Sequence, residues 1–346
     1  MSGHVRPTLR LGTNDADLER AAELLRGGGL VALPTETVYG LAVRADDADA
    51  VASLFAAKDR PADNPLIVHV GTIEDALRVA REVTPLARTL LERLAPGPLT
   101  VVLPARADLP RAVTGGLDTV AVRIPDHPVM REVLASCALP LAAPSANRSG
   151  RPSPTRADHV VADLDGRIDA VVDAGPTRVG LESTVVDARG TTWRVLREGG
   201  LGREAIAEAL RGTGYAAADA ADTDDGTSSP GTRHRHYAPA LPVHLARAGE
   251  GMARATELVT VAQGGRIGLI ASCVDGSTGA PPQVHVLATP RDAAALAADL
   301  FALLRNAEHV GVAALVVEAV EEYGIGRAVM DRLRRAVAAS GGTDAT

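Results

Sequence analysis

The feature that most constrains the fold is a break in hydrophobic patterning between Gly212 and Ala240. Short apolar runs and amphipathic stretches alternate on both sides of this segment. Within it Ala, Asp, Ser, Gly and Pro dominate, and no periodicity is visible. Loops of this length are typically functional lids or disordered linkers. We therefore predict a first domain over residues 1–211, a linker and lid over residues 212–240, and a smaller domain over residues 241–346.

The order of apolar runs predicts an α/β fold in both domains. Residues 15–26 carry apolar side chains at helical spacing and are followed by glycines, which predicts a helix that ends there. Residues 65–70, 99–103 and 120–124 are typical of buried strands. Because several strands follow one another directly, we predict a mixed, twisted sheet covered by helices. The strand–helix–strand–helix order beyond residue 241 predicts a smaller, Rossmann-like α/β domain.

Composition excludes broad nucleic-acid binding surfaces. The formal net charge is −7 and only 2% of residues are aromatic. A phosphate backbone needs clustered Lys and Arg, and stacked bases need flat side chains. An anionic substrate would therefore bind in a local basic pocket.

The sequence predicts a cytoplasmic protein with no membrane association. Its cysteines, Cys137 and Cys273, are far apart and do not form a CxxC motif, which favours a reducing compartment. No signal peptide is visible at the N-terminus, and no apolar stretch approaches the length of a membrane span.

Common cofactor motifs are missing or incomplete. The sequence has no GxxxxGK[ST] loop, and the glycine pattern at residues 324–329 lacks the third glycine of a dinucleotide site. His234 and His236 stand two residues apart with no third ligand nearby. We therefore predict neither a protein metal site nor an organic prosthetic group.

Polar segments lie beside several of the predicted strands. Residues 34–41 (PTETVYGL) and 144–150 (PSANRSG) follow a strand, and residues 58–65 (KDRPADNP) lie just before one. Hydroxyl groups at the carboxyl end of a strand commonly face a ligand, although Thr and Gly also favour plain turns. Neighbouring cations, such as those of residues 58–65, suit a phosphate chain or the solvated end of a helix.

Single polar residues also lie in or beside apolar strands. A lone His or Arg there is most often a structural group with satisfied hydrogen bonds. Taken together, however, four cations near strand ends would suit a polyanion such as ATP if one site held them all. These cations are Lys58, Arg60, Arg123 and Arg197.

The ordered set of these segments resembles the threonylcarbamoyl-AMP synthases, which share the YrdC-like fold. The matching segments cover almost all of residues 15–205, and the later ones point to the long, two-domain form of the family. They are GGLVALPTETVYGLA, FAAKDRPADNPLIVHV, PGPLTVVLP, VAVRIPDHP, LAAPSANRSGRPSPT, LESTVVD, LREG, SSPGTRHRHYAP and EEYGIGRAVMDRLRRA.

The resemblance implies an enzyme, a nucleotidyltransferase. It would convert L-threonine, bicarbonate or CO2, and ATP into L-threonylcarbamoyladenylate and pyrophosphate, with Mg²⁺ accompanying the ATP. A separate transferase complex would then pass the threonylcarbamoyl group to the adenosine beside the anticodon of certain tRNAs. The enzyme itself need not bind tRNA.

The resemblance also implies site positions. The family's polar tetrad around the nucleotide corresponds to Lys58, Arg60, Ser145 and Asn147. The implied threonine contacts are Thr37, His69, Arg123 and Ser183. The implied ATP contacts are Arg60, Asn64, Thr119, Ala143, Ser145, Ser153, Arg197, His236 and Tyr237, of which the last two belong to the linker.

Other functions remain open at this point. A YrdC-like module that binds tRNA without turnover is the main alternative, although charge and aromatic content disfavour it. Carbamoyl transfer in hydrogenase maturation would require cysteine-rich zinc motifs that this sequence lacks. The third alternative is a regulatory nucleotide-binding protein without turnover.

Overall fold

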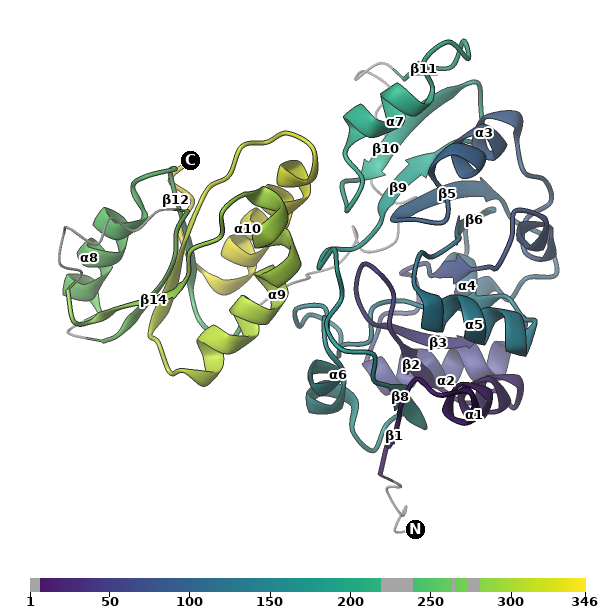
Figure 1. Cartoon of the computed structure of the whole chain (residues 1–346), viewed down its shortest axis with the longest axis horizontal. Helices are drawn as coiled ribbons and strands as arrows, with labels where there is room; N and C mark the ends of the chain where they lie inside the picture. The colour runs from purple at the N-terminus through teal and green to yellow at the C-terminus, as the bar shows by residue number, and fades with distance from the viewer. Residues whose placement is uncertain (1–6, 219–238, 263–264, 273–280) are drawn as a thin grey trace. The chain divides into compact units, whose positions relative to one another are not determined.

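The computed structural model describes residues 7–218, 239–262, 265–272 and 281–346. These residues fall into two units, one within residues 1–149 and 153–234 and the other within residues 150–152 and 235–346 (Figure 1). Most of the predicted linker lies outside the described residues. Its described beginning contains a short strand, Ala216–Ala217, that pairs with the first unit. The predicted domain bounds remain a prediction.

The first unit is built on an 11-stranded mixed sheet with the order β1-β8-β2-β3-β7-β4-β6-β5-β9-β10-β11. Its strands are β1 (Leu9–Leu11), β2 (Val31–Leu33), β3 (Gly40–Arg44), β4 (Ile67–His69), β5 (Leu99–Pro104), β6 (Thr119–Arg123), β7 (Leu141–Ala142), β8 (Ala170–Val172), β9 (Thr184–Asp187), β10 (Thr192–Arg197) and β11 (Ala216–Ala217). Its helices are α1 (Asp15–Arg26), α2 (Ala48–Lys58), the 3-10 helix η1 (Glu74–Arg78), α3 (Pro85–Leu94), α4 (Arg111–Thr114), α5 (Pro128–Cys137), α6 (Ala157–Leu164) and α7 (Arg203–Ala209).

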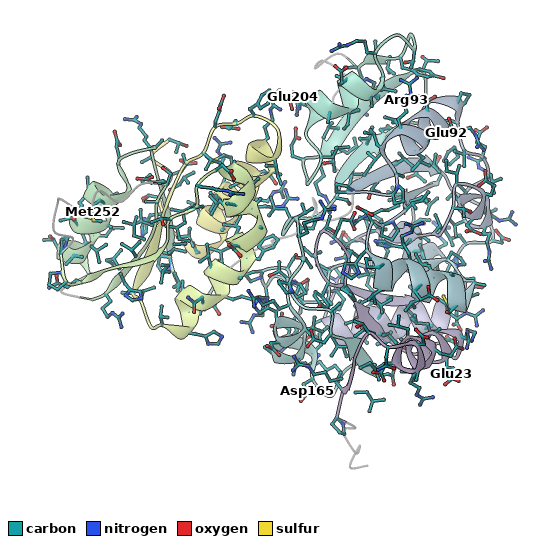
Figure 2. The ribbon with its side chains drawn as sticks, in the orientation of Figure 1. Glu23, Glu92, Arg93, Asp165, Glu204 and Met252 are labelled. Carbon is teal, nitrogen blue, oxygen red and sulfur yellow. The ribbon has the colours of Figure 1, made fainter. Side chains whose placement is uncertain are left out.

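Helices bury aliphatic side chains on both faces of this sheet. Apolar residues of α2, α3, α6 and α7 form one core cluster with alternate residues of the central strands. Helices α1 and α5 pack against each other and form a second cluster with β2, β7 and β8 on the opposite face. Charged side chains of these helices are exposed to solvent, as shown by the labelled Glu23 of α1 and by Glu92 and Arg93 of α3 (Figure 2). This amphipathic division is what anchors each helix to the sheet.

At the central strands, the sheet face opposite the first core cluster carries polar side chains instead of apolar ones. Val68, Val122 and Val101 of β4, β6 and β5 point into the first core cluster. Because strand side chains alternate, the next residues along, His69, Arg123 and Thr100, share the opposite face. Register pairs His69 with Arg123 and Arg123 with Thr100, so these buried polar residues form one cross-strand row.

The second unit is a smaller α/β domain. Its 4-stranded, all-parallel sheet has the order β12-β15-β13-β14, with α8 on one face and α9 and α10 on the other (Figure 1). Its elements are β12 (Val243–Ala246), α8 (Gly251–Val261), β13 (Ile267–Ile270), β14 (Val284–Ala288), α9 (Ala293–His309), β15 (Ala314–Glu318) and α10 (Ile325–Ser340).

The structure confirms the predicted fold class in both units. The helix predicted over residues 15–26 has these same bounds, and Asn14 caps it by accepting a hydrogen bond from the Asp17 amide. The sequence also predicts an α-helix over residues 73–80, but only a short 3-10 helix, Glu74–Arg78, forms there. Strand β3 was not predicted. It begins at Gly40, inside the polar segment of residues 34–41, so its start resembles a continued turn.

The first core cluster generates a stability prediction. Leu90 of α3 is fully buried in this cluster, which also contains Trp193, the single tryptophan. We expect Leu90→Ala to lower the free energy of unfolding by about 2–5 kcal/mol, because it leaves a cavity that packed neighbours cannot fill. Denaturation followed by Trp193 fluorescence measures this loss. The control Leu77→Ala, at a leucine that is 43% exposed, should change it by less than about 1 kcal/mol; equal effects of both would contradict the packing assignment.

Candidate active site

The segment after β2 folds into a tight hydroxyl-lined turn. The Thr35 hydroxyl oxygen accepts hydrogen bonds from the amides of Thr37 and Val38 at 3.1 and 3.2 Å, and it lies 2.7 Å from the Thr37 hydroxyl. The segment is pinned from outside as well, since the Val179 and Gly180 amides donate to the carbonyls of Glu36 and Thr37. Burial of the whole turn fixes where its side chains point.

Arg123 projects from the end of β6 into this turn. Its Nη1 donates to the Thr37 hydroxyl at 2.8 Å and its Nε to the Gly97 carbonyl at 3.3 Å. Its Nη2 lies 2.6 Å from Oε1 of Glu36, and the side chains of this ion pair are 4% and 1% exposed. A guanidinium held in this way retains N–H donors in a fixed plane, which suits bidentate binding of a carboxylate.

The hydroxyl of Ser183 is positioned by two neighbouring strands. It lies 2.7 Å from the Thr100 hydroxyl of β5. Nη2 of Arg197, from the end of β10, donates to the Ser183 carbonyl at 2.8 Å and to its hydroxyl at 3.3 Å. The structure thus connects Thr100, Ser183 and Arg197, while Thr100 is also the register partner of Arg123.

His69 is a neutral imidazole in this row. It is 3% exposed, and among the described residues neither ring nitrogen has a hydrogen-bond partner. Burial lowers the pKa of His69 to about 3, and the charge of Arg123 acts in the same direction. The backbone of Ile67 and Leu141 opposes this shift only in part. A neutral imidazole offers one donor and one acceptor to a ligand.

Lys58 and Arg60 are separated by a residue that turns the chain. Asp59, the C-cap of α2, adopts a left-handed conformation with φ of 52°, and its carboxylate accepts hydrogen bonds from Arg148 and Arg167. The turn sends Lys58 inward, where Nζ donates to the carbonyls of Ser145 and Asn147. Burial, with help from the charge of Arg60, places the pKa of Lys58 well below its usual value, and nearby Asp163 acts in the opposite direction.

The polar tetrad predicted from the sequence therefore centres on one loop. The Ser145 hydroxyl donates to Oδ1 of Asn147 at 2.6 Å, and both residues have carbonyls bound by Lys58. Arg60 turns the other way and donates to the carbonyls of Asn64 and Pro65 at 3.3 and 3.0 Å. The loop joins the hydroxyl-lined turn through a bridge between Gly40 and Ser145.

The remaining predicted residues are placed less closely. Thr119 and Ala143 are buried at the start of β6 and directly after β7. The Ser153 hydroxyl donates to Oε1 of Glu182 at 2.6 Å, next to Ser183 in the chain. His236 and Tyr237, the predicted linker contacts, lie outside the described residues.

Comparison with known proteins accounts for both units. Residues 23–199 match the Sua5, YciO and YrdC family, described as telomere recombination. Residues 201–338 match the C-terminal domain of threonylcarbamoyl-AMP synthase. Proteins named threonylcarbamoyl-AMP synthase are similar over most of their length: that of Pyrococcus abyssi is 42% identical (91% of this chain and 92% of the relative), and that of Bacillus subtilis is 40% identical (95% of each). The chain belongs to the threonylcarbamoyl-AMP synthase family.

A solved member of this family shares the fold of the whole chain. The crystal structure of P. abyssi Sua5 complexed with L-threonine aligns with a TM-score of 0.86 at 38% identity, covering 98% of this chain and 99% of that one. A Vibrio cholerae threonylcarbamoyl-AMP synthase is 36% identical over 53% of this chain and 97% of its own length. The sequence resemblance and the long two-domain form are thereby confirmed.

Three buried residues of this synthase-family site were not predicted. Glu36 pairs with Arg123, Thr100 contacts Ser183, and Glu182 accepts from Ser153. Two of them, Glu36 and Thr100, had a signal in the sequence. Glu36 is the one charge in a segment of hydroxyls and apolar residues, and Thr100 interrupts an apolar strand at a position that alternation places opposite the core.

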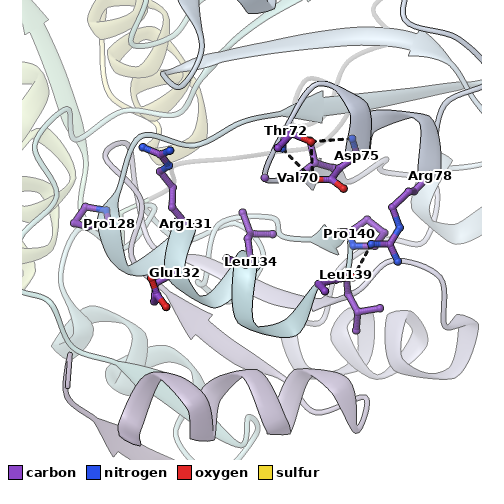
Figure 3. A pocket seen from close by; sticks show the side chains of 13 residues that line it. Val70, Thr72, Asp75, Arg78, Pro128, Arg131, Glu132, Leu134, Leu139 and Pro140 are labelled. Carbon is purple, nitrogen blue, oxygen red and sulfur yellow. Dashed lines mark hydrogen bonds between the residues drawn. The ribbon is translucent and has the colours of Figure 1, made fainter. Parts of the chain in front are cut away.

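A separate pocket of about 580 Å³ adjoins α5 on the same unit (Figure 3). None of the predicted site residues lines it. Two of its polar groups serve the local fold: Arg78 donates to the Ala138 carbonyl at 2.5 Å, and Asp75 accepts from Thr72. Within the described ranges there is no cluster of three or more His, Cys, Asp or Glu that could bind a metal ion, and no described helix is long and apolar enough to cross a membrane.

The burial of His69 generates a prediction about pH. Its folded-state pKa of about 3 lies below the ordinary value of 6.5. Between these values the unfolded chain binds a proton that the folded chain does not bind. Stability should therefore fall as the pH falls from about 6.5, by up to about 1.4 kcal/mol per pH unit from this group alone.

We expect the unfolding free energy of His69→Gln, measured between pH 7 and pH 4, to fall less with decreasing pH than that of the wild type, because the contribution of His69 is absent. The matched control His309→Gln, at an exposed histidine of α9, should keep the wild-type slope. Identical slopes for wild type and His69→Gln would show that His69 is not a buried neutral group.

Proposed function

We propose that this chain makes L-threonylcarbamoyladenylate and pyrophosphate from L-threonine, ATP and bicarbonate or CO2. The observation that carries the proposal is the buried Arg123 guanidinium with the Thr37 hydroxyl at 2.8 Å, inside a chain that aligns along nearly its whole length with named synthases. Such a site offers a planar cation to a carboxylate and hydroxyl groups to a polar side chain, which is the chemistry of threonine.

In this proposal the polar row on the sheet binds threonine. Arg123 takes the α-carboxylate, while His69 and Ser183 serve the β-hydroxyl and Thr37 completes the contact. Because these groups are buried, a side chain without a hydroxyl would leave them unpaired. Discrimination against valine should therefore be strong, as in other sites built around a substrate hydroxyl.

ATP belongs with the loop that Lys58 organises. Arg60 and Lys58 supply positive charge, and Ser145 and Asn147 supply neutral polar groups. Asn64, Thr119, Ala143, Ser153 and Arg197 are proposed as further contacts. A carbamate oxygen of carboxylated threonine attacks the α-phosphorus and pyrophosphate leaves, so the enzyme is a nucleotidyltransferase. Positioning and charge stabilisation dominate such a transfer. Mg²⁺ would arrive with the ATP and take most of its ligands from the phosphates.

A downstream transferase complex would consume the product for tRNA modification in the cytoplasm. The synthase needs no tRNA surface for this, in keeping with its net charge of −7. The His236 and Tyr237 segment would exclude water from the unstable carbamate.

Mass spectrometry tests the function directly. Purified protein mixed with ATP, Mg²⁺, L-threonine and bicarbonate should yield threonylcarbamoyladenylate and pyrophosphate, because every group needed for the transfer is carried by this chain or its substrates. Omission of threonine should abolish both products. A protein that binds tRNA with steep salt dependence but forms no adenylate would support the RNA-binding alternative and contradict the proposal.

Arg60 provides the corresponding substitution test. Arg60→Ala removes a partly exposed cation that donates to the backbone carbonyls of Asn64 and Pro65, so melting should change little while kcat/KM for ATP falls by roughly 100-fold or more. The control Arg131→Ala, at an exposed arginine of α5, should leave both unchanged. Wild-type turnover by a folded Arg60→Ala protein would remove Arg60 from the site.

A further inference from the structure

Glu36 is a buried carboxylate that the reaction described above leaves without a task. Its side chain is 1% exposed, and Oε1 lies 2.6 Å from Nη2 of Arg123. That contact lies outside hydrogen-bond geometry, and among the described residues neither carboxylate oxygen accepts a hydrogen bond. A carboxylate removed from water normally accepts several hydrogen bonds. Glu36 therefore has unfilled acceptor positions inside the proposed threonine site.

The chemistry of the missing donor follows from the neighbours of Glu36. Arg123 places a cation directly beside this anion, and the charge of Glu36 also acts on His127. Burial holds the pKa of His127 below its ordinary value despite the charge of Glu36, so this imidazole is neutral near pH 7. Adjacent opposite charges complement a zwitterion, in which ammonium and carboxylate are carried by the same carbon.

We propose that Glu36 binds the α-ammonium of the amino-acid substrate beside the carboxylate held by Arg123, and that it accepts the proton that this amine must lose. The inference rests on the proposed function. It gives a binding partner to the α-ammonium, the one polar group of threonine that the proposal above leaves without a contact. Glu36 then acts as a catalytic residue, and the Glu36–Arg123 pair restricts the site to α-amino acids.

The proton transfer fits the chemistry of carbamate formation. An N–H bond of the ammonium breaks and its proton passes to a Glu36 oxygen, which leaves the amine with a free electron pair. That pair forms the N–C bond to CO2 while one C=O pair moves onto oxygen. The second proton leaves to water, and the product is the carbamate. Without an acceptor, the substrate would remain an ammonium, which is not a nucleophile.

A structural role for Glu36 makes a different set of predictions. If Glu36 only orients Arg123, its loss should weaken every carboxylate ligand equally. If it binds the ammonium, its loss should weaken only ligands that carry one. Binding of L-threonine and of (2S,3R)-2,3-dihydroxybutanoate, in which a hydroxyl replaces the ammonium, separates these roles by isothermal titration calorimetry.

We expect Glu36→Gln to weaken threonine binding by roughly 10- to 100-fold and to leave the affinity for dihydroxybutanoate within about threefold. The matched control Glu132→Gln, at an exposed glutamate of α5, should bind both ligands as the wild type does. Equal weakening of both ligands by Glu36→Gln would overturn the proposal. If that variant does not fold, Glu36→Asp, which keeps the charge but retracts it, should show the same selective loss.

The rate of adenylate formation at saturating threonine tests the proton transfer. In Glu36→Gln it should be low near pH 7 and should rise with pH as solvent deprotonates the ammonium, whereas the wild-type rate should change much less. A Glu36→Gln rate with the pH profile of the wild type would overturn the role in proton transfer. Failure of the function itself looks different, since the wild type would then form no adenylate.

Discussion

The ion pair between Glu36 and Arg123 is the interaction on which the rest of the site depends. Burying two charges costs more than their attraction returns unless further partners compensate them. Here the Thr37 hydroxyl and the Gly97 carbonyl accept hydrogen bonds from Arg123, while no group among the described residues donates a hydrogen bond to Glu36. The pair fixes the guanidinium plane, joins the turn after β2 to the end of β6, and so sets the position of the cross-strand row that contains His69 and Thr100.

Lys58 has the corresponding role in the proposed ATP site. Its ammonium is bound by two carbonyls of the Ser145–Asn147 loop, and the Lys58 carbonyl accepts from the Ser149 amide. A cation so engaged organises the loop before it serves any ligand. Arg60, which the Asp59 turn directs elsewhere, donates to the Asn64 and Pro65 carbonyls. Neighbouring cations in the sequence thus have different tasks, which their spacing alone could not reveal.

The sequence predicted local structure well because local rules decide it. Helix α1 follows from its apolar spacing, its Asn14 cap and the glycines after Arg26. The tetrad of Lys58, Arg60, Ser145 and Asn147 was predicted from the family resemblance, and Ser145 and Asn147 also stand shortly after an apolar strand. Pairings between distant segments escaped prediction. Glu36 acquires its importance only from Arg123, and strand β1 exists only because β8 supplies its parallel partner.

Charge balance explains how an acidic protein can hold so many buried cations. Arg123 lies beside Glu36, the pKa of Lys58 is affected by Asp163, and Glu182 is buried next to Ser183, which Arg197 contacts. Arg123 and Lys58 therefore each have a carboxylate in their neighbourhood, so the site presents paired charges instead of a uniform positive field. A uniform field would favour any anion, including inorganic phosphate. Paired charges instead reward a ligand that carries both signs in the matching order, and among small metabolites that property belongs to amino-acid zwitterions.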